Sequence, residues 1–197
     1  ASDLPGSYSH NVDLAIEATL TINELVRDAA NYDFRPLSGG PLVGSGLLLT
    51  DVSDNITTFR GLADAHVGLT SDVGAYDVAP SIYWIPGRQT AAASRPVPPN
   101  NATGVRPNAD LMFLPPAAAV THYVYLGVAG ASLVRVRELV ASQTNIATPP
   151  SELVPGVTYE WRVDELLLDG STVTGETWSF SVGCADSDCL DCGTSTE

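Results

Sequence analysis

Apolar and polar residues alternate strictly near the start of the chain, in the segment SHNVDLAIEATLTIN at residues 9–23. Such alternation over many residues is typical of a β-strand with one buried face. Because strands usually have about five or six residues, this one has about twice the usual length. We predict one long strand whose inward side chains need a partner surface. Those side chains are Val12, Leu14, Ile16, Ala18, Leu20 and Ile22.

The second half of the chain contains several shorter strand-like runs. One of these runs contains a Pro155–Gly156 turn, and the last one contains the sequence WSFSV. In both runs the aromatic residues occupy alternate positions. We expect an antiparallel sandwich with Tyr159, Trp161, Trp178 and Phe180 in or bordering its core. The strand-like runs are residues 110–115, 121–128, 132–139, 153–170 and 175–182.

A composition break separates two regions at RQTAAASRPVPPNNATG, residues 88–104, where periodicity stops. This segment is interpreted as a linker or a first edge strand. The predicted organisation is a β-rich N-terminal region with the long first strand at 1–87, a linker at 88–104, a sandwich at 105–183 and a cysteine-containing tail at 184–197. Frequent turn residues, 17 Gly and 14 Pro among many Val and Thr, favour short strands, so the predicted fold class is all-β.

The run LVPGVTYEWRV at residues 153–163, together with WSFSV at 178–182 and YVYLG at 123–127, resembles a bacterial extracellular fibronectin type III domain over about residues 95–183. The resemblance implies a seven-strand sandwich in which the hydroxyl of Tyr159 hydrogen-bonds back to the backbone at a strand corner. It also implies a spacer or binding module without catalysis.

Two N-terminal stretches, NYDFRPLSGGPLVGSG at 31–46 and DVGAYDVAPSIYWIPGR at 72–88, resemble the closing segment of a right-handed parallel β-helix of the pectate-lyase-like class. The resemblance implies a short β-structure like the end of a β-helix. Fewer than 90 residues precede the linker, whereas a solenoid needs several stacked repeats. Catalytic residues of such lyases lie on central coils, so none is transferred to this chain.

The net charge of the chain limits the classes of partner that it can bind. All nine basic residues are arginine and stand against 23 acidic residues, giving −14. This balance argues against nucleic acid or an anionic membrane as partner. No run of 18 apolar residues occurs, so no membrane insertion is expected. An acid-rich surface without lysine favours an extracellular or cell-surface location.

Three cysteines, Cys184, Cys189 and Cys192, lie together in the tail. Their C-x4-C-x2-C spacing matches part of an iron–sulfur pattern but lacks a fourth cysteine, and no local context recruits a histidine for zinc. One disulfide with a spare thiol is the favoured arrangement. Oxygen-rich stretches at 51–55 and 186–191 are interpreted as turns, not calcium sites. We predict no metal and no cofactor.

Few residues suggest chemistry. Arg35 beside Asp33 is interpreted as a buried arginine that fixes a loop, with sugar binding as the alternative. Tyr83 and Trp84 are interpreted as a seal at the end of the first region, with a sugar-stacking platform as the alternative. The histidines, His10, His66 and His122, are far apart in sequence, and no nucleophile elbow is present, so no catalytic residue is predicted.

Two sequons, at Asn55 and Asn101, make both asparagines glycosylation candidates. We interpret the chain as a non-enzymatic structural subunit of an extracellular fibre or surface assembly. In this reading the long first strand exchanges between protomers, and the partners are copies of the chain itself. A carbohydrate-binding or adhesive module with glycan partners, and the non-catalytic C-terminal part of a β-helix polysaccharide lyase, remain the alternatives.

Overall fold

A computed structural model describes residues 21–44 and 76–183 of the chain. The regular structure of these residues is mostly β-strand, which confirms the all-β class. The chain divides into two compact units, each described by itself. The first unit comprises Ala1–Ala29 and Phe34–Pro80, and the second comprises Ala30–Asp33 and Ser81–Glu197.

The described part of the first unit begins with a short helix, α1, at Ile22–Leu25. Thr21 precedes the helix, and both its backbone N–H and its hydroxyl donate to the carboxylate of Glu24, at 2.6 and 2.9 Å. The backbone hydrogen bond from Thr21 lowers the pKa of Glu24, and the bond from the Thr21 hydroxyl adds to the effect. Leu25, Val26 and Leu42 form a small apolar cluster here. After α1 come β1 (Val26–Asp28), the 3₁₀ turn η1 (Ala29–Asn31) and β2 (Asp33–Pro36), with β1 paired to β2.

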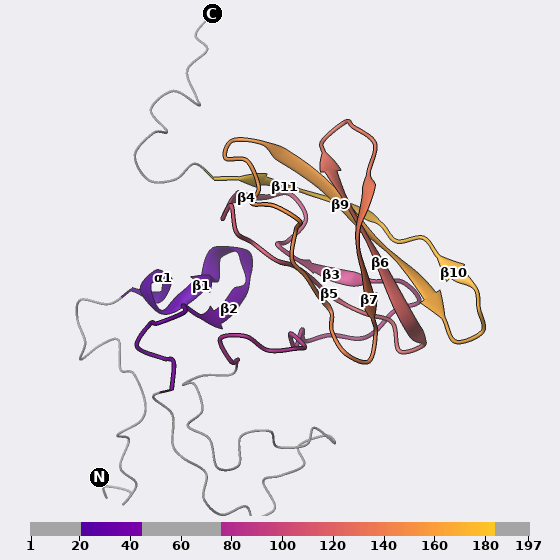
Figure 1. Ribbon diagram of the computed structural model, residues 1–197, viewed down its shortest axis with the longest axis horizontal. Coiled ribbons are helices and arrows are strands. Elements are labelled where there is room, and N and C mark those ends of the chain that lie inside the picture. The colour runs from indigo at the N-terminus through magenta and orange to yellow at the C-terminus, as the bar shows by residue number, and fades with distance from the viewer. Residues whose placement is uncertain (1–20, 45–75, 184–197) are drawn as a thin grey trace, which may run out of the picture. The chain divides into compact units, whose positions relative to one another are not determined.

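A six-stranded sheet forms the larger layer of the second unit (Figure 1). Its main order is β4-β11-β9-β6-β7, and β10 pairs with β9. The pairs β6–β7, β6–β9 and β9–β11 are antiparallel, whereas β4 runs parallel to β11. The strands are β4 (Ala102–Val105), β6 (Ala119–Val128), β7 (Val134–Val140), β9 (Thr158–Leu167), β10 (Thr172–Val173) and β11 (Thr177–Val182).

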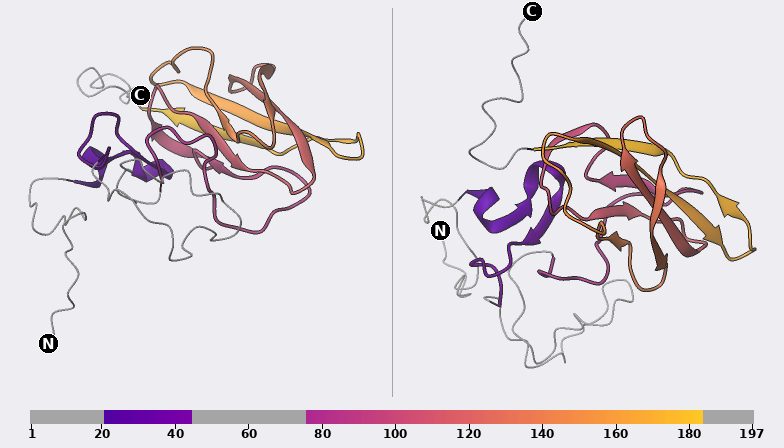
Figure 2. Two further views of the ribbon diagram at one scale, coloured as in Figure 1. Left: turned by 60° about the horizontal axis from the view of Figure 1, so that its bottom comes forward. Right: turned by 45° about the horizontal axis from the view of Figure 1, so that its top comes forward.

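The smaller layer is a three-stranded sheet with the order β3-β5-β8. It consists of β3 (Ser94–Val97), β5 (Leu111–Leu114) and β8 (Ile146–Ala147). Figure 2 shows the two layers from further directions. Because buried side chains of both sheets belong to one apolar cluster, the architecture is sandwich-like.

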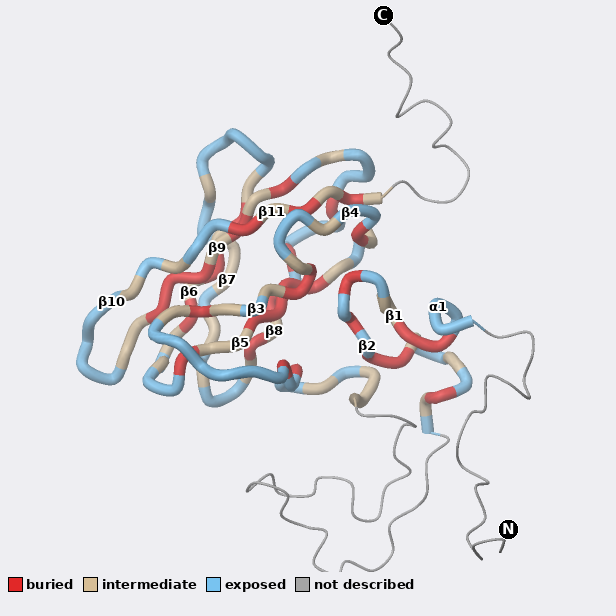
Figure 3. The backbone as a smooth tube through the Cα atoms, turned by 180° about the vertical axis from the view of Figure 1, so that it is seen from behind, coloured by how far each residue is buried: buried red, intermediate tan, exposed pale blue. Residues whose placement is uncertain are grey.

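The core between the sheets is built from alternate positions of the long strands. In β9 and β11 the predicted core residues Tyr159, Trp161, Trp178 and Phe180 are all buried, as the sequence predicts (Figure 3). The indole rings of Trp161 and Trp178 meet edge to face with their centroids 4.8 Å apart. Burial on every second position follows from the pleat of a strand, which turns neighbouring side chains to opposite faces.

The corner before β9 has the hydrogen bond that the resemblance to a fibronectin type III domain implies. The hydroxyl oxygen of Tyr159 accepts a hydrogen bond from the backbone N–H of Val154 at 3.0 Å. The ring of Tyr159 stacks on Phe180, with the two centroids 5.9 Å apart. This tyrosine therefore holds the corner and joins it to the core.

One predicted boundary needs correction. The segment 88–104, predicted as a linker, contains β3 and most of β4. These strands end the smaller and the larger sheet respectively. Of the two readings of this segment, the first edge strand is the one observed, and the sandwich begins at Ser94 instead of at residue 105. The short Pro-rich and Gly-containing sequences hide the strands because their apolar alternation is too brief to detect.

Candidate functional site

The edge strands of the two sheets differ in how well they could pair with another strand. In the described part of the chain, β8 and β10 have two residues each, β3 contains Pro96, and β4 contains Gly104 with a φ of +67°. β7 has seven residues, contains neither Pro nor Gly, and ends its sheet. An edge strand exposes a row of unpaired N–H and C=O groups, and Pro or short length prevents pairing with it. β7 is therefore the longest edge strand without Pro or Gly among the described residues, and its regular pairing with β6 is interrupted by a register shift between Arg135 and Arg137.

Hydrogen-bond alternation shows which backbone groups of β7 point outward. The N–H of Ala141 donates to the carbonyl oxygen of Val120 at 3.0 Å, directly beyond the end of β7. Antiparallel pairs alternate between hydrogen-bonded and non-hydrogen-bonded positions. The register of β6 and β7 therefore places Glu138 at a non-hydrogen-bonded position. Its N–H and C=O groups point away from β6, along the open edge.

The side chains of β7 lie at the margin of the core. No residue of β7 is fully buried, in contrast to β6 and β9 (Figure 3). Val136 and Leu139 pack partly against the core cluster, and Val134 is 64% exposed. The core-facing side of the larger sheet thus ends in apolar surface that the smaller sheet covers only in part.

The outer face of the larger sheet beside β7 carries an aromatic and basic row. The guanidinium of Arg135 lies over the ring of Tyr123 at 5.2 Å, and that of Arg162 over the ring of Tyr125 at 4.9 Å. Arg135 also forms an exposed ion pair with Glu138 at 3.4 Å. Such cation–π pairs fix the orientation of the arginines while leaving their edges near the solvent. Arg162 donates two hydrogen bonds to the carboxylate of Asp164, at 2.8 and 3.0 Å, so each arginine of this row has an acidic partner.

The long first strand falls mostly outside the described residues. Val12, Leu14, Ile16, Ala18 and Leu20 belong to the part of the chain that the structure does not describe. Ile22, predicted as the end of that strand, lies instead in α1 and is 45% exposed. The reason is local, because Thr21 and Glu24 bond to each other across the first turn and start a helix.

Of the candidate disulfide and glycosylation residues, only Asn101 lies within the described part of the chain. Cys184, Cys189, Cys192 and Asn55 lie outside the described residues. Asn101 is exposed, at a φ of +63° in the turn before β4, a conformation that asparagine tolerates. Its side-chain oxygen accepts a hydrogen bond from the Ser179 hydroxyl at 2.9 Å. Asn101 thus lies at the opposite end of the larger sheet from β7.

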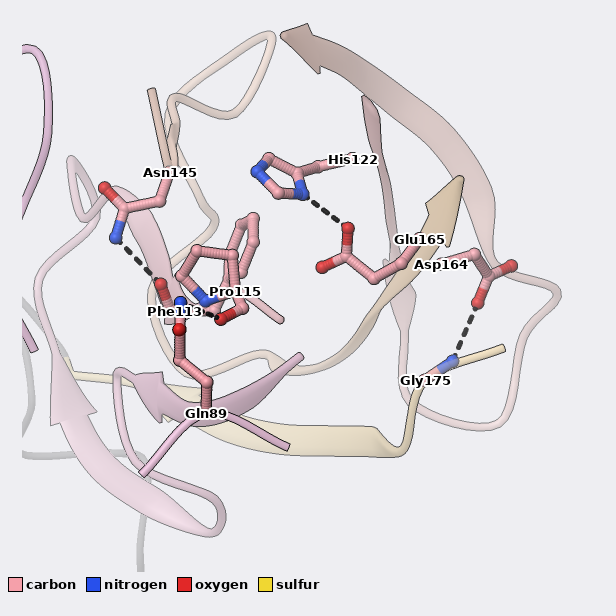
Figure 4. A network of polar contacts seen from close by, with 8 residues as sticks. All are labelled: Gln89, Phe113, Pro115, His122, Asn145, Asp164, Glu165 and Gly175. Atoms are coloured by element: carbon pink, nitrogen blue, oxygen red, sulfur yellow. Dashed lines mark hydrogen bonds and ion pairs between the residues drawn. The ribbon is translucent and has the colours of Figure 1, made fainter. Parts of the chain in front are cut away.

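The sugar-stacking alternative does not fit Tyr83, which is buried. Its backbone N–H donates to the Oδ1 atom of Asn145, and its carbonyl accepts from Nδ2 of the same side chain, both at 2.8 Å. Nδ2 of Asn145 also donates to the carbonyl of Phe113 at 2.8 Å (Figure 4). Asn145 therefore ties the segment around Tyr83 to β5. Trp84, in contrast, is 59% exposed.

Asp33 and Arg35 are both buried. Their burial fits the interpretation that Arg35 fixes a loop, because a sugar would have to reach the charged groups to bind them. Within residues 21–44 and 76–183, no three His, Cys, Asp or Glu side chains are grouped so that they could hold a metal ion. No helix among the same residues is long and apolar enough to cross a membrane.

A buried polar pair, His122 and Glu165, escapes the sequence reasoning. The two residues face each other across β6 and β9, with Nδ1 of His122 at 2.5 Å from Oε2 of Glu165 (Figure 4). Both side chains are fully buried, and the His122 ring meets Phe113 edge to face at 4.9 Å. In the described part of the chain, Nε2 of His122 and Oε1 of Glu165 have no hydrogen-bond partner.

The signal for this pair is the period of each strand. His122 has the parity of the buried Val124 and Leu126, and Glu165 has that of Trp161 and Val163. Parity alone would have placed both on the core side. Both side chains are fully buried between the sheets, and this burial supports a structural role for the pair.

Comparisons with known proteins identify no family. The sequence matches no protein-family model, and no curated protein matches it significantly.

Proposed function

We propose that the chain is a non-catalytic structural subunit of an extracellular fibre or surface assembly, joined by strand exchange between protomers. The observation that carries the proposal is the open edge of β7, seven residues long, with outward-pointing backbone groups and partly covered apolar side chains. An edge of this kind is a template for an added strand. The alternating segment at residues 12–22 supplies a sequence suited to that role up to Leu20.

The sandwich itself supports a module of the fibronectin type III kind. In its larger sheet the antiparallel pairs β6–β7 and β9–β11 are joined by the pairing of β6 with β9. Strands β3, β5 and β8 form the facing layer. The corner bond between Tyr159 and Val154 is the one the resemblance implies. β4 and β10 are short additions to the seven strands of that fold. Modules of this kind serve as spacers or binding units, which suits a structural subunit.

An extracellular location is part of the proposal. The acid-rich, lysine-free composition and the two sequons support it. The exposure of Asn101 supports it further, because an acceptor asparagine must be accessible to be glycosylated.

The carbohydrate-binding alternative has weaker support. Tyr83 is buried, and the rings of Tyr123 and Tyr125 are each covered on one face by an arginine. A sugar-stacking platform needs open ring faces. Trp84 remains exposed, but a single aromatic residue makes a small platform. For the lyase alternative, a long β-helix encoded upstream in the same gene would be the deciding observation.

The experiment compares assembly of the full chain with that of two matched variants. Sedimentation velocity and negative-stain electron microscopy at rising concentration should show filaments or large oligomers for the natural sequence. Ile16→Asp places a charge on the apolar face of the predicted strand and should abolish assembly. Thr19→Asp adds the same charge to the opposite face and should assemble. A natural chain that stays monomeric at millimolar concentration would contradict the proposal.

A further inference from the structure

We propose that the outer edge of β7 is the acceptor site for residues 12–20 of a second copy of the chain. The inference rests on the proposed function and adds the place where the exchanged strand binds. Among the described edges, β7 alone combines useful length with the absence of Pro and Gly. Backbone pairing there would use groups such as the N–H and C=O of Glu138, which point away from β6.

The apolar face of the segment matches the side of β7 that faces the core. In a strand, Val12, Leu14, Ile16, Ala18 and Leu20 all lie on one face. On β7 the apolar side chains at the core margin are Val134, Val136 and Leu139, and none of them is fully buried. A strand added beside β7 with its apolar face toward the core would extend the larger sheet. It would cover the surface that the smaller sheet leaves partly open.

The charges of the two strands are compared face by face. The other face of the segment carries Asp13 and Glu17 and no basic residue. On β7, Arg135 and Glu138 lie on the outer face and pair with each other. Arg137 lies opposite the buried Val124, on the core-facing side. Opposite charges on neighbouring strands stabilise pairing, and like charges destabilise it. Arg135 is therefore the one basic residue of β7 on the face that Asp13 and Glu17 would share, and the fit rests on the open backbone edge and the apolar side.

Donation to a second copy follows from the kind of assembly proposed. A donor segment at one place and an acceptor edge at another make a heterologous contact, which propagates when it does not close into a ring. If residues 12–20 paired with β7 of their own chain, the edge would be occupied and the chain would stay a monomer. The proposal therefore commits to an intermolecular contact.

The test maps the contact directly in the full chain. Val134 is replaced by the photoreactive residue benzoylphenylalanine, equal amounts of chains labelled with nitrogen-14 and nitrogen-15 are mixed under assembly conditions, and cross-linked peptides are identified by mass spectrometry. We expect cross-links from position 134 to residues 12–20, in pairs of mixed isotope. The control has the same probe at Val154, which is 56% exposed and lies in the turn before β9, and should give no such cross-link.

A second pair of variants tests the backbone edge. Glu138→Pro removes an outward N–H without removing a bond to β6, and should raise the concentration needed for assembly about tenfold or more, since tenfold corresponds to about 1.4 kcal/mol. Glu138→Ala loses the same charge but keeps the N–H, and should assemble within about twofold of the natural chain. Circular dichroism and denaturation midpoints verify that both variants are folded.

The outcomes separate this inference from the function on which it rests. Filaments whose cross-links join β7 to another β7, to the same chain or to residues outside 12–20 overturn the acceptor site and leave the assembly role intact. Normal assembly of a folded Glu138→Pro variant does the same. A natural chain that forms no assembly at all overturns both proposals.

Discussion

At the scale of single residues, the centre of interest is the buried pair of His122 and Glu165. Removing one partner from a buried, hydrogen-bonded pair leaves the other without compensation, whereas apolar side chains of similar size can fill the same space. The two atoms of the pair that lack partners in the described structure add to the cost of keeping polar groups there. The pair therefore reduces stability relative to an apolar core, while each member depends on the other.

We predict that His122→Leu alone lowers the free energy of unfolding by about 3 to 5 kcal/mol. The double variant His122→Leu with Glu165→Met should be about as stable as the natural chain, or more stable, because no uncompensated polar group remains. Urea denaturation of both proteins measures the difference. Equal destabilisation by the single and the double variant would show that packing, and not the polar pair, sets the stability at this site.

At the scale of elements, the corner before β9 joins a loop to the core through Tyr159. Its hydroxyl oxygen accepts a hydrogen bond from the N–H of Val154, and its ring stacks on Phe180. Removing the hydroxyl affects only the first contact. The corner is also where a sequence pattern and an observed bond agree most closely.

Tyr159→Phe should therefore lower the free energy of unfolding by about 1 kcal/mol, the usual net value of one such hydrogen bond. Tyr125→Phe is the matched control, because the ring of Tyr125 stays under Arg162 and its change should have an effect within about 0.5 kcal/mol. Denaturation midpoints at constant slope measure both. An unchanged midpoint for Tyr159→Phe would mean that the corner does not need the hydroxyl.

Local pattern predicts much of the sandwich but not its pairing. The parity of β9 and β11 places Trp161, Trp178 and Phe180 in the core, because period two is a property of each strand alone. The facing of His122 and Glu165 depends on the register between β6 and β9, which local periodicity does not contain. The same holds for the open edge of β7, since an edge is defined only by the order of strands in the sheet.

Element boundaries show where one local signal overrides another. Alternation extends the predicted first strand to Ile22, yet the Thr21-x-x-Glu24 pattern starts α1 at that residue. The sequence contains both signals, and the hydrogen bonds between Thr21 and Glu24 stabilise a helix at Ile22 in place of a continued strand. In the predicted linker, β3 and β4 are only four residues each, too short for periodicity to reveal them.

At the scale of the whole molecule, the proposed assembly must overcome a net charge of −14 on every copy. Like charges on neighbouring copies repel, and salt screens this repulsion beyond about 8 Å at physiological ionic strength. We place the proposed association of copies at the open edge of β7.

Amide hydrogen exchange of the full chain at low and high protein concentration reports directly on whether copies join at β7. Peptides that cover residues 134–140 report on the outward amides of β7, and peptides that cover β9 serve as an internal reference for folding. We expect exchange in 134–140 to slow strongly as assembly proceeds, while exchange in β9 stays unchanged. If assembly proceeds and exchange at 134–140 remains as fast as in the dilute chain, the edge of β7 is not where the copies join, and the account is contradicted.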